Sequence, residues 1–194
     1  MIIGPVDQDQ NLFHIRQAMP ESLINKIINT DWLSMPWTRP QLQAHWKRRK
    51  INNSAIPWIG EWNTAMNLLW AEIVNFLGDR GWAHETYPDT VFWLDEPDFR
   101  CGMHVDGGLI GAMQLFWIGD IDNGTCFYNT KNFDDLRYQF SFLSNQGYLT
   151  ITVPTAENFT PLLWHAMPTP VKQNTFRITS YTRVTCPPQP AWTL

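Results

Sequence analysis

Two stretches in the first half of the chain carry hydrophobic residues at intervals of three and four. The first follows Pro20 and Glu21, which are favoured in the first turn of a helix, and it predicts a helix over about residues 20–30. The second predicts a helix over residues 62–77, with Gly78 placed to end it. We expect its apolar stripe to pack against a sheet; the stripe consists of Ala65, Met66, Leu69, Trp70, Ile73 and Leu77.

The second half of the chain changes to short apolar or alternating runs separated by turn residues. One earlier run, at 11–16, has the same alternation. The run at 111–118 is apolar at successive positions, so we expect a strand that is buried on both faces. Many short strands after a helical segment predict an α+β, mostly β fold, a β-sandwich or barrel with the N-terminal helices packed on one sheet. The other predicted strands are 90–94, 100–105, 124–128, 138–143, 148–153, 162–166 and 175–184.

The segment 31–57 shows no periodicity and is predicted to be a long loop. Loops of this length in compact domains are often functional, so we expect part of it to cover a site. It contains a basic and aromatic cluster at 45–50, His-Trp-Lys-Arg-Arg-Lys. Such a cluster can grip an acidic or nucleic-acid substrate, but we favour a solvated surface, because most charge runs are solvated.

Length and charge limit the classes of function. The 194 residues suit a single domain over 1–194, with a helical part at about 1–85 and a strand-rich core at about 89–185. The net charge of −4 gives no electrostatic argument for nucleic acid or an anionic membrane. We find neither a signal peptide nor a segment apolar enough to span a bilayer. Three cysteines, an odd and sparse set, argue against a disulfide framework and favour a cytoplasmic protein.

The strongest chemical signal is His104-x-Asp106, between two predicted strands. Residues two apart in a strand share a face, so an imidazole and a carboxylate would lie side by side, as two ligands of a divalent metal. His165, in an apolar run at 161–168, is the candidate third ligand, and its separation from His104 suits a strand at the far side of a sandwich or barrel. Two histidines and one carboxylate on iron leave positions open for oxygen and substrate. The alternative is a structural, hydrogen-bonded histidine.

Cys101, three residues before His104, raises the question of a zinc site. No second Cys/His pair stands at zinc spacing, so we interpret Cys101 as a packing residue.

Four short motifs, in this order, resemble the 2-oxoglutarate/Fe(II)-dependent oxygenases, and within them the prolyl-hydroxylase-like group. They cover roughly residues 90–184, and the preceding helices also suit that fold. The resemblance implies a double-stranded β-helix (jelly roll) at about 89–185 whose pocket holds Fe(II) and 2-oxoglutarate and uses O2. The motifs are His104-x-Asp106, Gly124-Thr125-x-Phe127, His165 and Arg177-Ile178-Thr179-Ser180.

By this resemblance, His104, Asp106 and His165 would bind Fe(II) and form the catalytic centre. Arg177 would hold the distal carboxylate of 2-oxoglutarate, because a guanidinium fork matches a carboxylate in two parallel hydrogen bonds. Thr179, on the same strand face, would add a hydroxyl donor. The implied reaction hydroxylates an unreactive C–H bond of a peptide or small molecule and releases succinate and CO2.

Three positions complete the expected co-substrate site. Arg183 shares the strand face of Arg177 and is the alternative cation. Many members of the group have a tyrosine where this chain offers Phe92 and Trp93. Gln114 is a candidate to supply a polar contact instead, although an amide on a buried strand can also serve only the backbone.

Two other classes of function remain open. A cupin-like jelly roll would bind a metal or ligand without turnover, and it would have no use for an inward arginine deep in the pocket. A carbohydrate- or peptide-binding sandwich would expose Trp32, Trp37 and Trp46 and leave the two histidines far apart. The substrate and the oligomeric state are not encoded in any motif, and we expect residues 31–57 and 95–110 to select the substrate.

Overall fold

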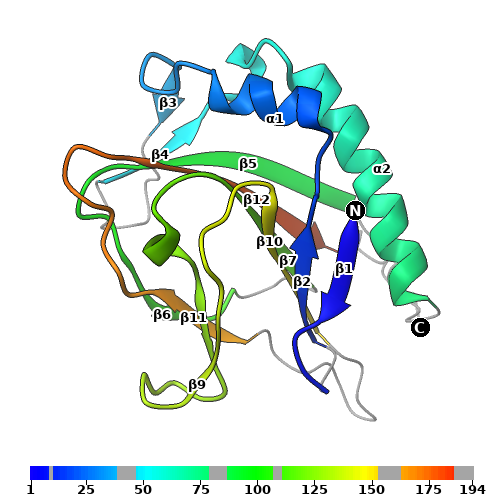
Figure 1. Ribbon diagram of the computed structural model, residues 1–194, viewed down its shortest axis with the longest axis vertical. Helices are drawn as coiled ribbons and strands as arrows, with labels where there is room; N and C mark the ends of the chain where they lie inside the picture. Colours follow the sequence, from blue (N-terminus) through cyan, green and yellow to red (C-terminus); the bar gives the residue numbers. More distant parts are fainter. Residues whose placement is uncertain (9–10, 39–46, 79–86, 107–110, 153–162, 186–194) are drawn as a thin grey trace, which may run out of the picture.

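The computed structural model describes residues 1–8, 11–38, 47–78, 87–106, 111–152 and 163–185. In this part of the chain, two antiparallel sheets form the centre of the molecule and two α-helices lie beside them (Figure 1). The predicted class, an α+β, mostly β jelly roll with N-terminal helices packed on one sheet, is confirmed. None of the helices in these residues combines the length and the apolar character needed to cross a bilayer.

The larger sheet has eight strands in the order β1-β2-β10-β7-β12-β5-β4-β3. Its central strand β7 is buried at every position except the last, as its continuous apolar sequence predicted. In the middle of the sheet, neighbouring strands come from distant parts of the chain, as in β2-β10-β7-β12-β5, which is the crossing pattern of a double-stranded β-helix. The strands are β1 (Ile2–Pro5), β2 (Leu12–Arg16), β3 (Trp37–Thr38), β4 (Arg48–Ile51), β5 (Tyr87–Asp95), β7 (Gly111–Ile118), β10 (Gln146–Ile151) and β12 (Arg177–Thr185).

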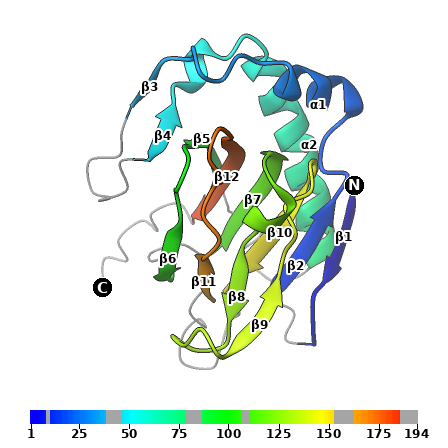
Figure 2. The same ribbon diagram turned by 60° about the vertical axis from the view of Figure 1, so that its left-hand side comes forward.

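The smaller sheet has four strands in the order β6-β11-β8-β9 and lies in front of the larger sheet in Figure 2. Aromatic side chains fill part of the space between the sheets, with Phe116 and Tyr148 from the larger and Phe127 from the smaller in one buried cluster. The strands are β6 (Cys101–His104), β8 (Cys126–Tyr128), β9 (Leu136–Gln139) and β11 (Trp164–Met167).

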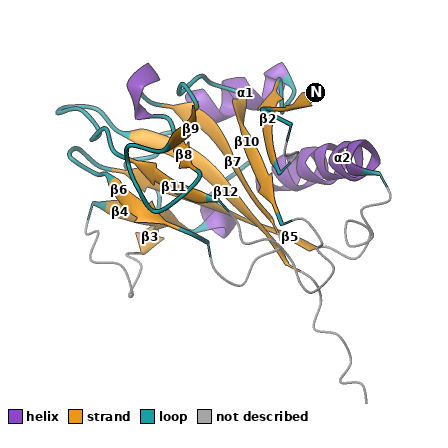
Figure 3. Cartoon of the chain, turned by 90° about the horizontal axis from the view of Figure 1, so that it is seen from below, coloured by secondary structure: helices purple, strands orange, loops and turns teal. Residues whose placement is uncertain are grey.

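The helices α1 (Glu21–Ile28) and α2 (Ile59–Leu77) were both predicted, and α2 begins three residues earlier than expected. Gly78 ends α2 with a φ of 61°, and its N–H donates to the carbonyl of Val74. Both helices contribute to the main hydrophobic core against the larger sheet, and α2 runs beside its strands (Figure 3). The buried residues of the α2 stripe are Trp62, Met66, Leu69, Trp70, Ile73 and Leu77.

The prediction of a loop over 31–57 is wrong for part of the segment. Residues 37–38 and 48–51 form β3 and β4, which extend the larger sheet beyond β5. β4 pairs with β5 in the register Arg48↔Asp95. Charged pairs, not apolar alternation, mark β4, so hydrophobic periodicity does not reveal it. Trp46 lies outside the described residues.

Candidate functional site

The two histidines of the predicted metal site face each other on adjacent strands. His104 in β6 and His165 in β11 are direct partners in the antiparallel ladder, and their ring centres lie 4.2 Å apart. The expectation that His165 comes from the far side of the sandwich is therefore wrong, since both strands belong to the smaller sheet. Sequence separation alone does not distinguish the two arrangements.

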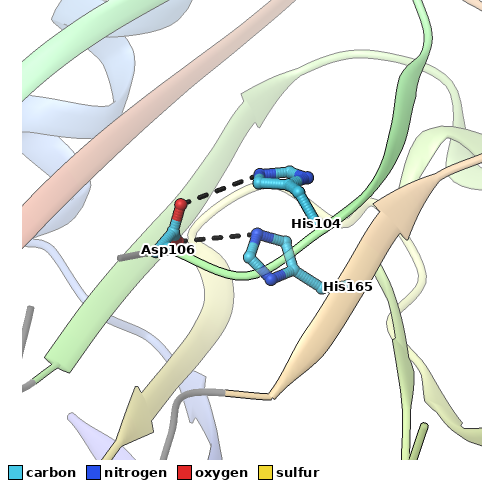
Figure 4. Close-up of side chains that lie close together, drawn as sticks. All are labelled: His104, Asp106 and His165. Carbon is cyan, nitrogen blue, oxygen red and sulfur yellow. Dashed lines mark ion pairs between the residues drawn. The ribbon is translucent and has the colours of Figure 1, made fainter. Parts of the chain in front are cut away.

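Asp106 follows the end of β6 and completes the group, as the close-up in Figure 4 shows. One carboxylate oxygen, Oδ1, lies 3.7 Å from His104 Nε2, and the other, Oδ2, lies 3.5 Å from His165 Nε2. The ligand atoms of all three residues lie within 4.8 Å of one another. Oδ2 is buried and has no hydrogen-bond partner among the described residues. A buried carboxylate oxygen facing two imidazoles fits a divalent cation, because such an oxygen needs a partner.

Backbone contacts orient both imidazoles toward the carboxylate. Nδ1 of His104 lies 2.9 Å from the carbonyl oxygen of Gly102, and Nδ1 of His165 lies 3.1 Å from that of Leu163. A carbonyl only accepts, so each Nδ1 carries the hydrogen and each Nε2 is free to bind a metal. Burial lowers the pKa of His165, which favours the neutral imidazole that ligates metals.

Cys101 does more than fill space. It packs near Phe99, as predicted, but it also lines the pocket and places its Sγ 3.6 Å from His104 Nδ1. This contact with Cys101 is the main reason that the pKa of His104 rises to about 9. A cation at Nε2 must therefore compete with a proton on the ring.

A pocket opens beside the three ligands, between the two sheets. Gln114 on β7 stands at its centre and lies in register with both Tyr148 on β10 and Tyr181 on β12. The pocket is lined by Arg48, Trp93, Cys101, His104, Asp106, Gln114, Thr125, Tyr148, His165, Ala166, Met167 and Tyr181.

The amide of Gln114 joins other side chains, not the backbone. Its Oε1 accepts hydrogen bonds from Thr125 Oγ1 and from the Tyr148 hydroxyl, both at 3.1 Å. Its Nε2 donates to Thr179 Oγ1 at 3.3 Å. Thr125 and Thr179, from two of the motifs, and Gln114, from the buried strand β7, thus form one buried network at the pocket.

Two tyrosines supply the hydroxyls that Phe92 and Trp93 lack. Trp93 lines the pocket, whereas Phe92 belongs to the core under the helices. Burial raises the pKa of both Tyr148 and Tyr181, so each remains a neutral hydroxyl at physiological pH. Neither tyrosine was predicted from the sequence, because their register with Gln114 depends on the placement of β10 and β12 on either side of β7.

A buried ion cluster lies next to the pocket. Arg177 points inward, as the resemblance implied, and is 2% exposed. Its Nε donates to Asp95 Oδ2 at 2.8 Å, and its Nη1 donates to the carbonyl of Asn123 at 2.8 Å. Arg48 approaches the same carboxylate, with Nε 2.6 Å from Oδ1 and Nη2 3.0 Å from Oδ2. Arg183, the alternative cation, is exposed and does not line the pocket.

The expectation that the basic cluster at 45–50 is solvated is wrong for Arg48. Its side chain is 13% exposed and pairs with Asp95, which is fully buried. Arg49 is also largely covered and pairs with Glu96, while Lys47 stays exposed. Burying a guanidinium requires a paired carboxylate, and the partners lie in β5 and just after it.

The sandwich with open tryptophans does not agree with the structure. Trp32 is buried, and the histidines that this class would leave far apart are adjacent. Trp37 is exposed, unlike Trp32. Its ring stacks on the guanidinium of Arg49, and the ring centre lies 4.3 Å from Arg49 Cζ.

No protein-family model matches the chain, and no curated protein matches it in sequence. Solved structures do match. The viral collagen prolyl hydroxylase of Paramecium bursaria chlorella virus 1, in its 2-oxoglutarate (2OG) complex, has a TM-score of 0.58 at 12% identity, over 91% of this chain and 96% of that one. A prolyl-4-hydroxylase of Pseudomonas putida has a TM-score of 0.62 at 10% identity, over 90% and 92%.

A third match is not named as a prolyl hydroxylase. HygX of Streptomyces hygroscopicus, solved with nickel and 2-oxoglutarate bound, has a TM-score of 0.54 at 10% identity, over 91% of this chain and 83% of that one. HygX has also been solved with hygromycin B bound. At sequence identities this low, the structural matches show a shared fold and no more. The chain therefore has the jelly-roll fold of the prolyl-hydroxylase-like 2-oxoglutarate oxygenases.

Proposed function

We propose that this protein is a 2-oxoglutarate- and Fe(II)-dependent dioxygenase that hydroxylates a C–H bond of a peptide or small molecule and releases succinate and CO2. The observation that carries the proposal is the set of three ligands, His104, Asp106 and His165, beside a pocket with buried cations next to it. The solved proteins of the same fold support it, since their names include prolyl hydroxylases and 2-oxoglutarate complexes.

The ligand set would hold iron through the two Nε2 atoms and the carboxylate of Asp106. A facial set of two histidines and one carboxylate leaves other positions for a 2-oxo acid and for oxygen. The iron, when bound, supplies oxygen activation and C–H oxidation. The protein orients the imidazoles through the carbonyls of Gly102 and Leu163 and keeps water away with the aromatic side chains between the sheets.

The inner part of the pocket would receive 2-oxoglutarate. Two guanidinium groups, those of Arg177 and Arg48, share the single carboxylate of Asp95, so the buried cluster keeps one positive charge. That charge suits the distal carboxylate of 2-oxoglutarate. Thr179 and Gln114 would fix the polar side of the co-substrate through the hydroxyl and amide network described above. The inward arginines disfavour the cupin-like binding module, which needs no cation there.

The test is anaerobic titration of the protein with Fe(II) and 2-oxoglutarate, followed by the weak visible charge-transfer band of the chelated 2-oxo acid. We expect a band in the wild type that is absent in Asp106→Ala, because that variant lacks the carboxylate ligand. The control is Asp122→Ala, which removes an exposed carboxylate of the same chain and should keep the band.

Succinate formation in air, measured against a peptide and a small-molecule substrate panel, then tests turnover. A wild type that is folded and binds Fe(II) but shows neither the band nor succinate would overturn the dioxygenase proposal and leave the metal-binding jelly roll as the better account.

A further inference from the structure

We infer that Arg48, on the β3–β4 side of the larger sheet, is the residue that donates hydrogen bonds to the distal carboxylate of the co-substrate, and that Arg177 acts as a positioning residue behind it. The inference rests on the proposed function. It assigns the contact to a residue of the basic cluster at 45–50, outside the motifs that carry the resemblance.

Each nitrogen of the Arg177 guanidinium already has a buried acceptor. Nε donates to Asp95 Oδ2 at 2.8 Å, and Nη2 lies 2.7 Å from the same oxygen. Nη1 donates to the backbone carbonyl of Asn123 at 2.8 Å. Every nitrogen of the guanidinium therefore has a partner, and the side chain is 2% exposed and does not line the pocket. A ligand would have to break one of these buried contacts to reach it, which costs free energy.

Arg48 has the opposite properties. It lines the pocket, and its hydrogen bonds to the described residues use only Nε and Nη2, both with Asp95. Nη1 therefore keeps two donors for a ligand. The orientation of the group is fixed, because Cζ lies 4.2 Å from the ring centre of Phe99 and 5.2 Å from that of Trp93. A guanidinium held in place before the ligand arrives loses little entropy on binding.

The net charge of the Arg48–Asp95–Arg177 cluster also favours an anion at Arg48. Burial alone would raise the pKa of Asp95, but Arg48 and Arg177 outweigh burial and lower it, so the carboxylate stays ionised. Two cations and one anion leave a net positive charge, in an environment where an uncompensated charge is costly. Binding an anion at the pocket side of Arg48 removes that cost.

Neighbouring ion pairs hold Arg48 in position. Lys47 Nζ lies 2.6 Å from Asp98 Oδ2 on one side, and Arg49 pairs with Glu96 on the other. Three consecutive basic residues thus bind three acids of β5 and the turn after it. The affinity for the co-substrate therefore depends on the docking of β4 against β5.

The experiment is calorimetric titration of 2-oxoglutarate into the Ni(II)-loaded protein, with 2-oxopentanoate, which has a methyl group in place of the distal carboxylate, as the second probe. We expect Arg48→Met to bind 2-oxoglutarate about 10- to 100-fold more weakly, the range expected for a lost charge-assisted hydrogen bond. Its affinity for 2-oxopentanoate should equal that of the wild type, and Arg48→Lys should recover part of the loss.

The control is Arg16→Met, which removes an exposed arginine at the end of β2, in the same sheet but outside the pocket. It should bind both acids as the wild type does. We expect the Ni(II) affinity to be the same in all variants, which would show that the metal site is folded. In Arg48→Met, Asp95 stays paired with Arg177, so the buried ion cluster becomes neutral.

Each other outcome overturns the inference. Wild-type affinity for 2-oxoglutarate in Arg48→Met would show that the carboxylate binds elsewhere. An equal loss for both acids would show that Arg48 only supports the pocket. A wild type that binds Ni(II) but not 2-oxoglutarate would overturn the proposed function itself, and the role of Arg48 with it.

Discussion

Asp95 is the residue on which the buried cations depend. It is fully buried at the end of β5 and is the shared partner of Arg48 and Arg177. A carboxylate in this position sets the orientation of both guanidinium groups at once. Without it, two like charges would lie close together away from water, which is among the costliest arrangements in a protein interior.

We therefore expect Asp95→Asn to lower the free energy of unfolding by about 3–5 kcal/mol at neutral pH, because it leaves buried cations without a counter-charge. The pKa of Asp95 is lowered in the folded state, so its stabilisation is complete above the ordinary value of 3.8 and is lost as the pH falls through the folded pKa. The difference in free energy of unfolding between the wild type and Asp95→Asn should thus shrink as the pH drops below 3.8.

Urea unfolding across pH, with Asp98→Asn as the control, measures this effect. Asp98 is an exposed partner of Lys47, so its variant should unfold almost as the wild type does. An Asp95→Asn protein as stable as the wild type at neutral pH would contradict the role assigned to the carboxylate.

At this scale, residue type together with local spacing predicted the metal ligands but not the buried ion cluster. His104, Asp106 and His165 were identified by the types of ligand that they offer, and the structure brings them together. Arg48 was missed because its partner lies 47 residues further along the chain, and only strand pairing makes the two neighbours. The pairing of Arg177 with Asp95, 82 residues away in the chain, was missed for the same reason.

Among the elements, β10 depends on one glycine at a close backbone contact. Gly147 pairs with Leu115 of β7 and Ile15 of β2, and a Cβ added to it would lie 1.9 Å from the carbonyl oxygen of Gln114. No side chain fits there unless the two strands separate. Gly147 lies within β10, and the turn before the strand contains Asn145, which has a φ of 61°.

Gly147→Ala should therefore destabilise the protein by roughly 1–3 kcal/mol or more, as expected for overpacking, and should displace Gln114 from its network. The control is Gly60→Ala in the first turn of α2, where no atom lies within 4 Å of the added Cβ. It should be neutral or stabilise by up to about 1 kcal/mol through helix propensity. Thermal unfolding separates the two; similar midpoints for both variants would contradict the close contact.

The elements that stood out most clearly in the sequence were those with a strong pattern of hydrophobic residues. Both helices and the strand at 111–118 fall in this class. The short strands β1, β3 and β4 did not stand out. β1 and β3 are the edges of the larger sheet, β4 lies next to an edge, and the three strands have few buried side chains.

In the whole molecule, the larger sheet separates a packing layer from the site. Successive residues of β5 show the division: Phe92 packs with Trp32, Trp58 and Trp62 under the helices, whereas Trp93 lines the pocket. Most of the buried tryptophans in the described residues belong to this packing layer.

Substitutions at these two positions should therefore separate stability from binding. Phe92→Ala should lower the free energy of unfolding by about 3–5 kcal/mol, as for a large buried aromatic, and leave the Ni(II) affinity of the folded protein unchanged. Trp93→Ala should weaken 2-oxoglutarate binding and cost less stability, because its ring is only partly buried. Paired urea unfolding and titration measure both; loss of Ni(II) affinity in folded Phe92→Ala would contradict the separation of the two layers.

The direct pairing of His104 with His165 has a consequence for how the chain folds. The strands β6 and β11 are each four residues long, and β6 is the edge of its sheet. Shifting one strand by a single residue would place Trp164 or Ala166 opposite His104 and turn His165 toward the other face. Two strands this short form few backbone hydrogen bonds, so these bonds alone define the register weakly. A cation that needs both imidazoles binds only when the strands are in the native register. Metal binding therefore stabilises the native register over the shifted ones.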